Sequence, residues 1–203
     1  MRKKLNVLSI DGIVGVGKTT QINMVRNLLK REGIDSKTFD FQKQISASDL
    51  KEKLLTVYNY IKNNQDTVVL LDGSVATTIS QDYTNMMNYE QIYKKYKESI
   101  QIYEDMNSKF NFVNFILSPL DINMCDSRLV RKSNLFKTSL EIIENKSQLN
   151  TLKDALKNFQ NLPFNWNISF NVLDIDEGDS IMTIHSSILT HIKKEYQIVK
   201  PSM

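Results

Sequence analysis

The stretch that decides the fold is residues 12–19, Gly-Ile-Val-Gly-Val-Gly-Lys-Thr. It fits the pattern G-x-x-x-x-G-K-[ST], in which glycines let the backbone wrap around a polyphosphate with its N–H groups pointing inward. In such a loop Lys18 reaches the β- and γ-phosphates, and the Thr19 hydroxyl can ligate Mg²⁺. The sequence therefore predicts a site for the phosphates of a nucleoside triphosphate, with contacts from Gly12, Gly15, Val16, Gly17, Lys18, Thr19 and Thr20.

The segments on either side of this loop have the order that the phosphate site needs. Leu5–Ile10 (LNVLSI) predicts a short buried strand that leads into the loop. Thr19–Arg31 carries apolar residues at helical spacing, and Gly33 lies just past its end. A helix that begins at the loop adds the positive end of its dipole to the anion site. Strand, loop and helix together make a chance glycine-rich turn an unfavoured alternative.

The rest of the chain alternates predicted strands and helices, which is typical of βαβ units with a parallel sheet. We expect an α/β fold of the P-loop NTPase type, with three layers, a five-stranded parallel sheet, helices on both faces and a small lid. The other strands are predicted at Lys37–Phe41, Thr67–Leu71, Asn111–Leu117 and Phe170–Ile175. The other helices are predicted at Asp49–Lys62, Thr77–Met106 (in two parts, broken near Asn85–Asn88), Ile122–Lys132, Leu140–Phe159 and Ser180–Glu195.

Composition limits the kind of protein. With 203 residues, 41% of them hydrophobic, and only 6 Gly and 3 Pro, the chain is expected to form one domain over residues 1–203. A net charge of +3 is too weak to argue for a nucleic-acid partner, and no apolar run approaches membrane-spanning length. The single cysteine, Cys125, excludes an internal disulfide and is interpreted as a buried structural thiol. We expect a soluble cytoplasmic protein without a nucleic-acid or membrane partner.

Two carboxylates fall where parallel strands are predicted to end. Asp72 follows the apolar run Val68–Leu71, and a carboxylate there can hold the water shell of a Mg²⁺ that bridges the phosphates. The alternative is an ordinary turn or helix-cap aspartate. Asp11 directly precedes the loop and could act near the metal or an acceptor hydroxyl, or could equally satisfy backbone N–H groups. Both alternatives stay open for Asp11.

A basic stretch ends the helix predicted at Ile122–Lys132. Arg128, Arg131 and Lys132 precede a segment that we interpret as a lid at about residues 131–139. Cations on a closing lid can neutralise the charge that develops as a phosphoryl group moves. Cations also favour helix C-termini because of the helix dipole, which is the alternative. With Lys18 and Asp72, Arg128 and Arg131 complete the predicted catalytic set.

On these motifs the chain resembles the thymidylate kinases and related deoxynucleoside monophosphate kinases. Ser9–Gln21 (SIDGIVGVGKTTQ) is similar to that family's E-G-x-D-G-x-G-K-T-T-Q opening, and Asp72–Ile79 (DGSVATTI) to its D-R-Y-x-x-S-S-x stretch. Asp126–Phe136 resembles the family's E-R-x-x-x-R segment that leads into the lid. The resemblance implies ATP and Mg²⁺ as cofactors, a nucleoside monophosphate as acceptor, and a homodimer. On this basis the candidate substrate contacts are Asp11, Lys43, Ser74 and Tyr83.

The departures from that family concern the acceptor side. Gly73 stands where the family has arginine, and Val14 stands where the phosphate loop has an acidic residue. The family's T-R-E-P-G-G-T segment is replaced by residues 41–46, which leaves Lys43 as the nearby cation. Two alternatives to a monophosphate kinase therefore stay open. One is a deoxynucleoside kinase, whose uncharged acceptor needs fewer cations, and the other is a nucleotide-binding regulator with impaired catalysis.

Overall fold

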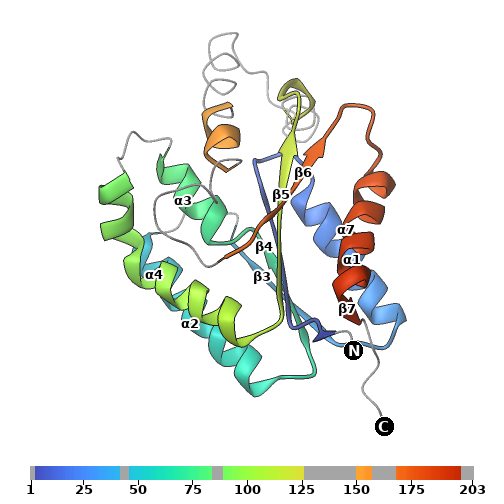
Figure 1. Cartoon of the computed structure of the whole chain (residues 1–203), viewed down its shortest axis with the longest axis horizontal. Coiled ribbons are helices and arrows are strands. Elements are labelled where there is room, and N and C mark those ends of the chain that lie inside the picture. Colours follow the sequence, from blue (N-terminus) through green and yellow to red (C-terminus); the bar gives the residue numbers. More distant parts are fainter. Residues whose placement is uncertain (1–2, 42–45, 84–88, 126–149, 157–167, 198–203) are drawn as a thin grey trace, which may run out of the picture.

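The computed structural model describes residues 3–41, 46–83, 89–125, 150–156 and 168–197. Its centre is a five-stranded sheet in the order β3-β4-β2-β5-β6, and every neighbouring pair is parallel. Figure 1 shows the sheet in the middle of the molecule. The strands are β2 (Val7–Gly12), β3 (Ser36–Asp40), β4 (Val68–Asp72), β5 (Phe112–Pro119) and β6 (Asn171–Ile175). The predicted five-stranded parallel sheet is confirmed.

Helices cover both faces of this sheet, so the predicted three layers are also confirmed. Helices α1 (Lys18–Arg31) and α7 (Ile181–Glu195) lie on one face. The other face is covered by α2 (Ala47–Asn63), α3 (Val75–Tyr83) and α4 (Tyr89–Lys109) (Figure 1). The break that we predicted near Asn85–Asn88 falls on residues outside the described ranges.

Some predicted elements fall outside the described residues. These are the lid at about 131–139, most of the helix predicted at Ile122–Lys132, and both ends of the helix predicted at Leu140–Phe159. Residues 150–156, inside the latter range, are helical. None of the helices in the described ranges combines the length and the apolar character that crossing a membrane requires.

Two helices, α2 and α7, begin at a serine that caps them locally. Ser46 precedes α2, and its hydroxyl accepts a hydrogen bond from the Asp49 backbone N–H at 3.1 Å. Asp49 returns the contact by accepting from the Ser46 backbone N–H, which completes a capping box. Ser180 caps α7 in the same way, by accepting from the Thr183 N–H at 3.0 Å.

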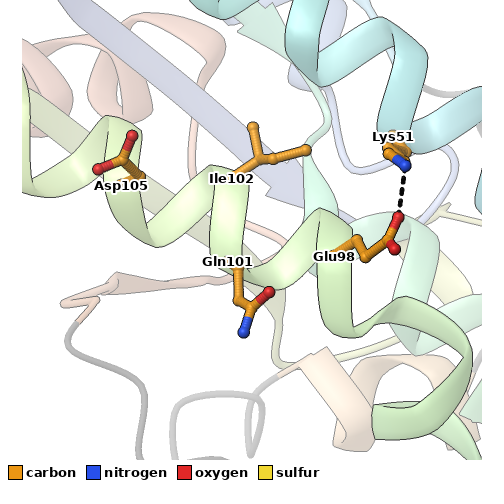
Figure 2. Close-up of a pocket in the computed structure, with 5 residues that line it drawn as sticks. All are labelled: Lys51, Glu98, Gln101, Ile102 and Asp105. Carbon is orange, nitrogen blue, oxygen red and sulfur yellow. Dashed lines mark ion pairs between the residues drawn. The ribbon is translucent and has the colours of Figure 1, made fainter.

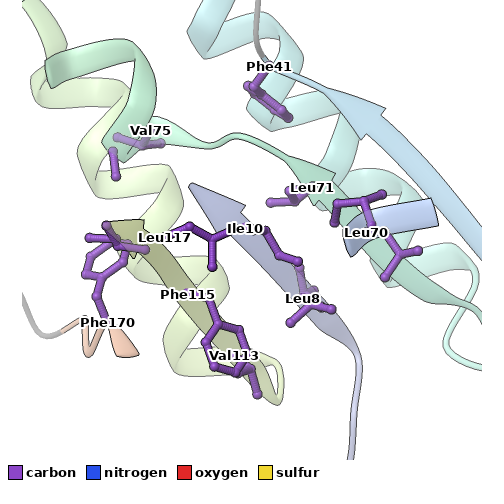
Figure 3. Close-up of a cluster of buried hydrophobic side chains, with 14 of the residues drawn as sticks. Leu8, Ile10, Phe41, Leu70, Leu71, Val75, Val113, Phe115, Leu117 and Phe170 are labelled. Atoms are coloured by element: carbon purple, nitrogen blue, oxygen red, sulfur yellow. The ribbon is translucent and has the colours of Figure 1, made fainter. Parts of the chain in front are cut away.

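The core lies on both sides of β2. All six residues of this strand are buried, because β4 and β5 pair with its two edges and helices cover its two faces. Apolar side chains of β2, β4 and β5, with Phe41, Val75 and Phe170, pack around it (Figure 3). Burial of this kind removes about 25 cal/mol of unfavourable hydration per Å² of apolar surface. The central position of β2 gives the loop that follows it a rigid base.

A second, two-stranded sheet was not predicted. β1 (Lys3–Lys4) pairs in parallel with β7 (Tyr196–Gln197), which directly follows α7. The Tyr196 hydroxyl also donates to the Phe112 carbonyl oxygen at 3.3 Å. Strands of two residues carry too little periodicity for a sequence pattern to reveal them.

Candidate active site

The predicted phosphate loop lies at the carboxyl end of β2 and leads into α1. Gly12 has φ 150°, and a Cβ at this position would lie 2.8 Å from both the Leu117 carbonyl oxygen and Val16 Cγ1. Only glycine therefore fits where the loop leaves the sheet. Gly17 is the N-cap of α1, and no side chain caps it. The geometry suits a loop whose backbone N–H groups serve an anion.

Lys18 is folded over this loop. Its Nζ donates to the carbonyl oxygens of Gly12 at 2.9 Å and of Ile13 at 3.0 Å, and the residue is only 4% exposed. Burial lowers the pKa of Lys18, while the charges of Asp72 and Asp11 act in the opposite direction. A partly desolvated ammonium group is thus held at the mouth of the loop, where it interacts strongly with anions.

The other loop residues differ in their exposure. Val16 is buried, whereas the side chains of Thr19 and Thr20 are exposed. Val14 is 45% exposed, so an apolar side chain faces outward from the loop itself. Thr19 directly follows Lys18 in the first turn of α1.

Asp72 lies beside this loop because the two parent strands are adjacent. It ends β4 and is paired in register with Ile10 of β2, two residues before the loop begins. Asp72 is 4% exposed, and its charge acts on the buried ammonium of Lys18. A carboxylate oxygen is the ligand type that Mg²⁺ prefers. The structure thus brings Lys18 and Asp72 together at one edge of the sheet.

Gly73 has a structural reason to be glycine. Its φ of 79° lies in the left-handed region. An added Cβ would meet Phe41 atoms only at 3.4–3.5 Å, which is ordinary contact. The restriction is therefore in the backbone, and any other side chain, arginine included, would cost about 1–2 kcal/mol in this conformation.

Two predicted substrate contacts, Asp11 and Ser74, are completely buried and bonded to each other. Asp11 accepts from the Ser74 backbone N–H at 2.8 Å and from the Ser74 hydroxyl at 2.7 Å. It also accepts from the backbone N–H of Thr77 at 3.0 Å and the hydroxyl of Thr77 at 2.6 Å. Of the two alternatives for Asp11, the geometry favours the one in which it satisfies backbone N–H groups.

Sequence reasoning missed a buried polar cluster next to Asp11. The Tyr103 hydroxyl donates to Asn114 Oδ1 at 2.7 Å, and the Ser9 hydroxyl donates to the same oxygen at 2.9 Å. Burial raises the pKa of Tyr103 and keeps its hydroxyl a donor. The available signal was the presence of Ser9 and Asn114 inside otherwise apolar strands. Such residues need partners when they are buried.

The remaining predicted residues are not placed in the site. Lys43, Arg128 and Arg131 lie outside the described residues, and Tyr83 is the last residue of α3. A separate hollow of about 420 Å³ lies between α2 and α4 (Figure 2). It includes none of the predicted site residues and is lined by Lys51, Glu98, Gln101, Ile102 and Asp105.

A parallel sheet in this order, with a glycine-rich phosphate loop between its central strand and the first long helix, defines a fold of the P-loop NTPase type. Among solved structures, the chain is similar to thymidylate kinase from Candida albicans, with a TM-score of 0.60, 15% identity, and coverage of 98% of this chain and 96% of that one. It is also similar to deoxyadenosine kinase from M. mycoides with bound dCTP, with a TM-score of 0.51, 16% identity, and coverage of 93% and 99%. At these identities the likeness shows the fold, which is thymidylate kinase-like as the sequence predicted.

The similarity in sequence covers less of the chain than the similarity in structure. A segment of 111 residues is 26% identical to "Probable thymidylate kinase" of Methanosphaera stadtmanae. This match covers 42% of the chain and 57% of that relative, so little more than half of the relative's length is represented. No protein-family model matches the chain.

Proposed function

We propose that this chain is a Mg²⁺-dependent kinase that transfers the γ-phosphoryl group of ATP to a deoxynucleoside monophosphate. The observation that carries the proposal is the buried Lys18 folded over the glycine loop, with Asp72 on the neighbouring strand end. The thymidylate kinase likeness in sequence and fold supports a nucleotide as the acceptor.

The described residues fit the donor and its metal. Lys18 and the loop backbone hold the donor phosphates, and Thr19 and Asp72 hold Mg²⁺. The hydroxyl of Thr19, an exposed residue, and the carboxylate of Asp72, a buried one, are hard oxygen donors, which suit this ion. When bound, Mg²⁺ neutralises charge on the β- and γ-phosphates. The protein's own part is to position the phosphates and to keep Lys18 desolvated beside them.

On the acceptor side, the proposal assigns charge neutralisation to Arg128 and Arg131, with Lys43 as a further cation. A transition-state arginine is worth roughly 10³–10⁵ in rate, so a kinase that has Gly73 in place of arginine needs cations from elsewhere. Tyr83 is retained as a candidate contact to the acceptor. We further propose that the protein is cytoplasmic and acts as a homodimer.

A deoxynucleoside kinase is the second candidate, favoured by the left-handed backbone at Gly73, because arginine is disfavoured there. An uncharged acceptor requires fewer cations. The fold likeness to deoxyadenosine kinase is compatible with this reading. A regulator that binds ATP without turnover is the third candidate.

A single panel separates these candidates. ADP release is measured with Mg-ATP and each deoxynucleoside monophosphate, ribonucleoside monophosphate and nucleoside in turn. We expect turnover with at least one deoxynucleoside monophosphate. Turnover with nucleosides alone would favour the second candidate, and tight Mg-ATP binding without any turnover would favour the third.

A further inference from the structure

Asp11 is a carboxylate with no access to solvent, and both of its oxygens accept hydrogen bonds from other protein groups. Oδ1 accepts from the Ser74 N–H, the Thr77 N–H and the Thr77 hydroxyl, at 2.8, 3.0 and 2.6 Å. Oδ2 accepts from the Ser74 hydroxyl at 2.7 Å, and the Ser9 hydroxyl, which donates to Asn114, lies 3.5 Å away. Both oxygens are thus bonded to α3 or to the residue before it, and the side chain is 0% exposed, so a metal or an acceptor hydroxyl has no path to it. Asp11 therefore acts on other protein groups and does not contact the substrate.

The position of Asp11 is unusual for a helix cap. A capping side chain normally belongs to the residue just before the helix, but Asp11 lies on β2, more than 60 residues before α3 (Val75–Tyr83). A local cap is present as well, because the Ser74 hydroxyl accepts from the Ala76 N–H at 3.2 Å. Asp11 thus connects strand β2 to helix α3, in addition to capping that helix.

Those two elements carry the two halves of the candidate site. The next residue, Gly12, begins the phosphate loop and accepts a hydrogen bond from Lys18 Nζ. On the other side, the Gly73 N–H donates to the Ile10 carbonyl oxygen at 2.9 Å, and Ser74 is then bound by Asp11. The chain that leaves Asp72 is therefore fixed at two successive residues of β2.

We propose that Asp11 is a positioning residue, which sets the metal-binding carboxylate of Asp72 and the start of α3 relative to the phosphate loop. This inference rests on the proposed function. Hydrogen-bond geometry, and not negative charge, is the property required. An asparagine at position 11 can preserve it, since its oxygen can accept from the Ser74 and Thr77 N–H groups while its NH₂ donates to the Ser74 hydroxyl, which can accept.

The test compares Asp11→Ala with Asp11→Asn by calorimetric titration of ATP, with and without Mg²⁺, and by steady-state kinetics. For Asp11→Ala we expect ATP binding without Mg²⁺ to stay near the wild-type value. The gain in affinity on adding Mg²⁺, and kcat, should each fall about tenfold or more, as expected from the loss of several buried hydrogen bonds. Asp11→Asn should restore both to within about threefold, because its hydrogen bonds are kept.

Two further variants guard against a general loss of folding. Thr77→Val removes one donor to Asp11 from the α3 side and should give the same selective loss, at about threefold. Asn107→Ala removes internal hydrogen bonds to Tyr103 and Asn114 at the other end of the polar cluster, and should leave the Mg²⁺-dependent gain unchanged.

The proposal is overturned if Asp11→Asn is as impaired as Asp11→Ala, or if loss of binding is equal with and without Mg²⁺. It is also overturned if Thr77→Val matches the wild type. Failure of the proposed function looks different: wild-type protein would bind Mg-ATP without turnover, while the Mg²⁺-dependent binding differences among these variants would still decide the role of Asp11.

Discussion

Two strand-to-helix junctions lie side by side at the same edge of the sheet, and they are built in opposite ways. At the first, β2 passes through a glycine-rich loop into α1, whose N-cap, Gly17, receives no side-chain cap. At the second, β4 turns through Gly73 and Ser74 into α3, and Asp11 accepts from the backbone N–H groups of Ser74 and Thr77 at the start of this helix. Helix N-termini attract anions, but only where their N–H groups are accessible. We infer that the first junction is built to bind phosphate and the second to be held in place.

Replacing Lys18 tests the first junction with the largest expected effect. Lys18→Ala should lower kcat by roughly 10²–10³-fold, the range for removing one preorganised group that stabilises transition-state charge. It should also abolish the thermal stabilisation of the protein by ATP. The ligand-free protein should keep its melting temperature, because the lost group is a buried cation with a lowered pKa.

Lys30→Ala, an exposed lysine in the last turn of α1, is the matched control and should behave like the wild type. Wild-type ATP affinity and turnover in Lys18→Ala would break the assignment of phosphate binding to this junction.

Replacing Asp72 tests the second junction. Asp72→Asn keeps the shape of the side chain but removes the charge of the proposed metal ligand. We expect the Mg²⁺-dependent part of ATP affinity to fall about 10–100-fold, as when groups that support a metal site are removed. ATP binding in EDTA should be unchanged, which calorimetry can measure on the same protein.

Asp40→Asn gives the comparison, since Asp40 is the exposed residue paired with Asp72 at the end of β3. An equal effect of the two substitutions would show that Asp72 supplies only a general negative charge.

Gly12, where β2 passes into the phosphate loop beside Leu117 of β5, is the next most sensitive position. Gly12→Ala would place a Cβ 2.8 Å from the Leu117 carbonyl oxygen, in an unfavourable backbone conformation. We expect the free energy of unfolding to fall by about 1–3 kcal/mol, the range for overpacking. Urea titration measures this free energy. As a control, Gly178→Ala should change it little, because a Cβ added at Gly178 would meet no atom within 4 Å.

The smallest expected effect concerns the contact between α1 and α7. Gln21 of α1 donates from Nε2 to the Ile181 carbonyl oxygen at 3.0 Å, and its Oε1 lies 3.2 Å from Nδ1 of the buried His185 of α7. Burial lowers the pKa of His185 from its ordinary value of 6.5. The unfolded chain therefore binds a proton more readily, so stability is present above this value and is lost as the pH falls through the folded-state pKa.

His185→Gln should lose less stability than the wild type between about pH 7.5 and about pH 5.5, because it removes this titration. Unfolding in urea at the two pH values is the measurement. Identical pH dependence in the two proteins would show that His185 does not carry a coupled proton.

The sequence predicted the parts of this comparison that are local along the chain. The phosphate loop, its strand and its helix are contiguous, and Asp72 follows an apolar run whose strand end could only fall at the same edge. The positions of the five strands along the chain, and the helical character of most of Thr77–Met106, also followed from periodicity. Each of these features depends on the spacing of apolar and polar residues within a single segment of the chain.

The remaining features depend on contacts between distant segments. Asp11 finds its partners at Ser74 and Thr77, and sequence reasoning left its role open because only the fold brings them together. The left-handed turn at Gly73 likewise involves a distant segment, because the Gly73 N–H donates to the Ile10 carbonyl oxygen of β2. The pairing of β1 with β7 involves strands too short to have a pattern.

The contrast between the two junctions is tested most directly by amide hydrogen exchange, measured by NMR with and without Mg-ATP. We predict that the amides of Gly15, Gly17 and Lys18 gain protection only when the nucleotide is added. The amides of Ser74 and Thr77 should already be protected without it and should change little. The account would be contradicted if the exchange of the loop amides did not change on adding Mg-ATP. It would also be contradicted if the amides of Ser74 and Thr77 became protected only upon its addition.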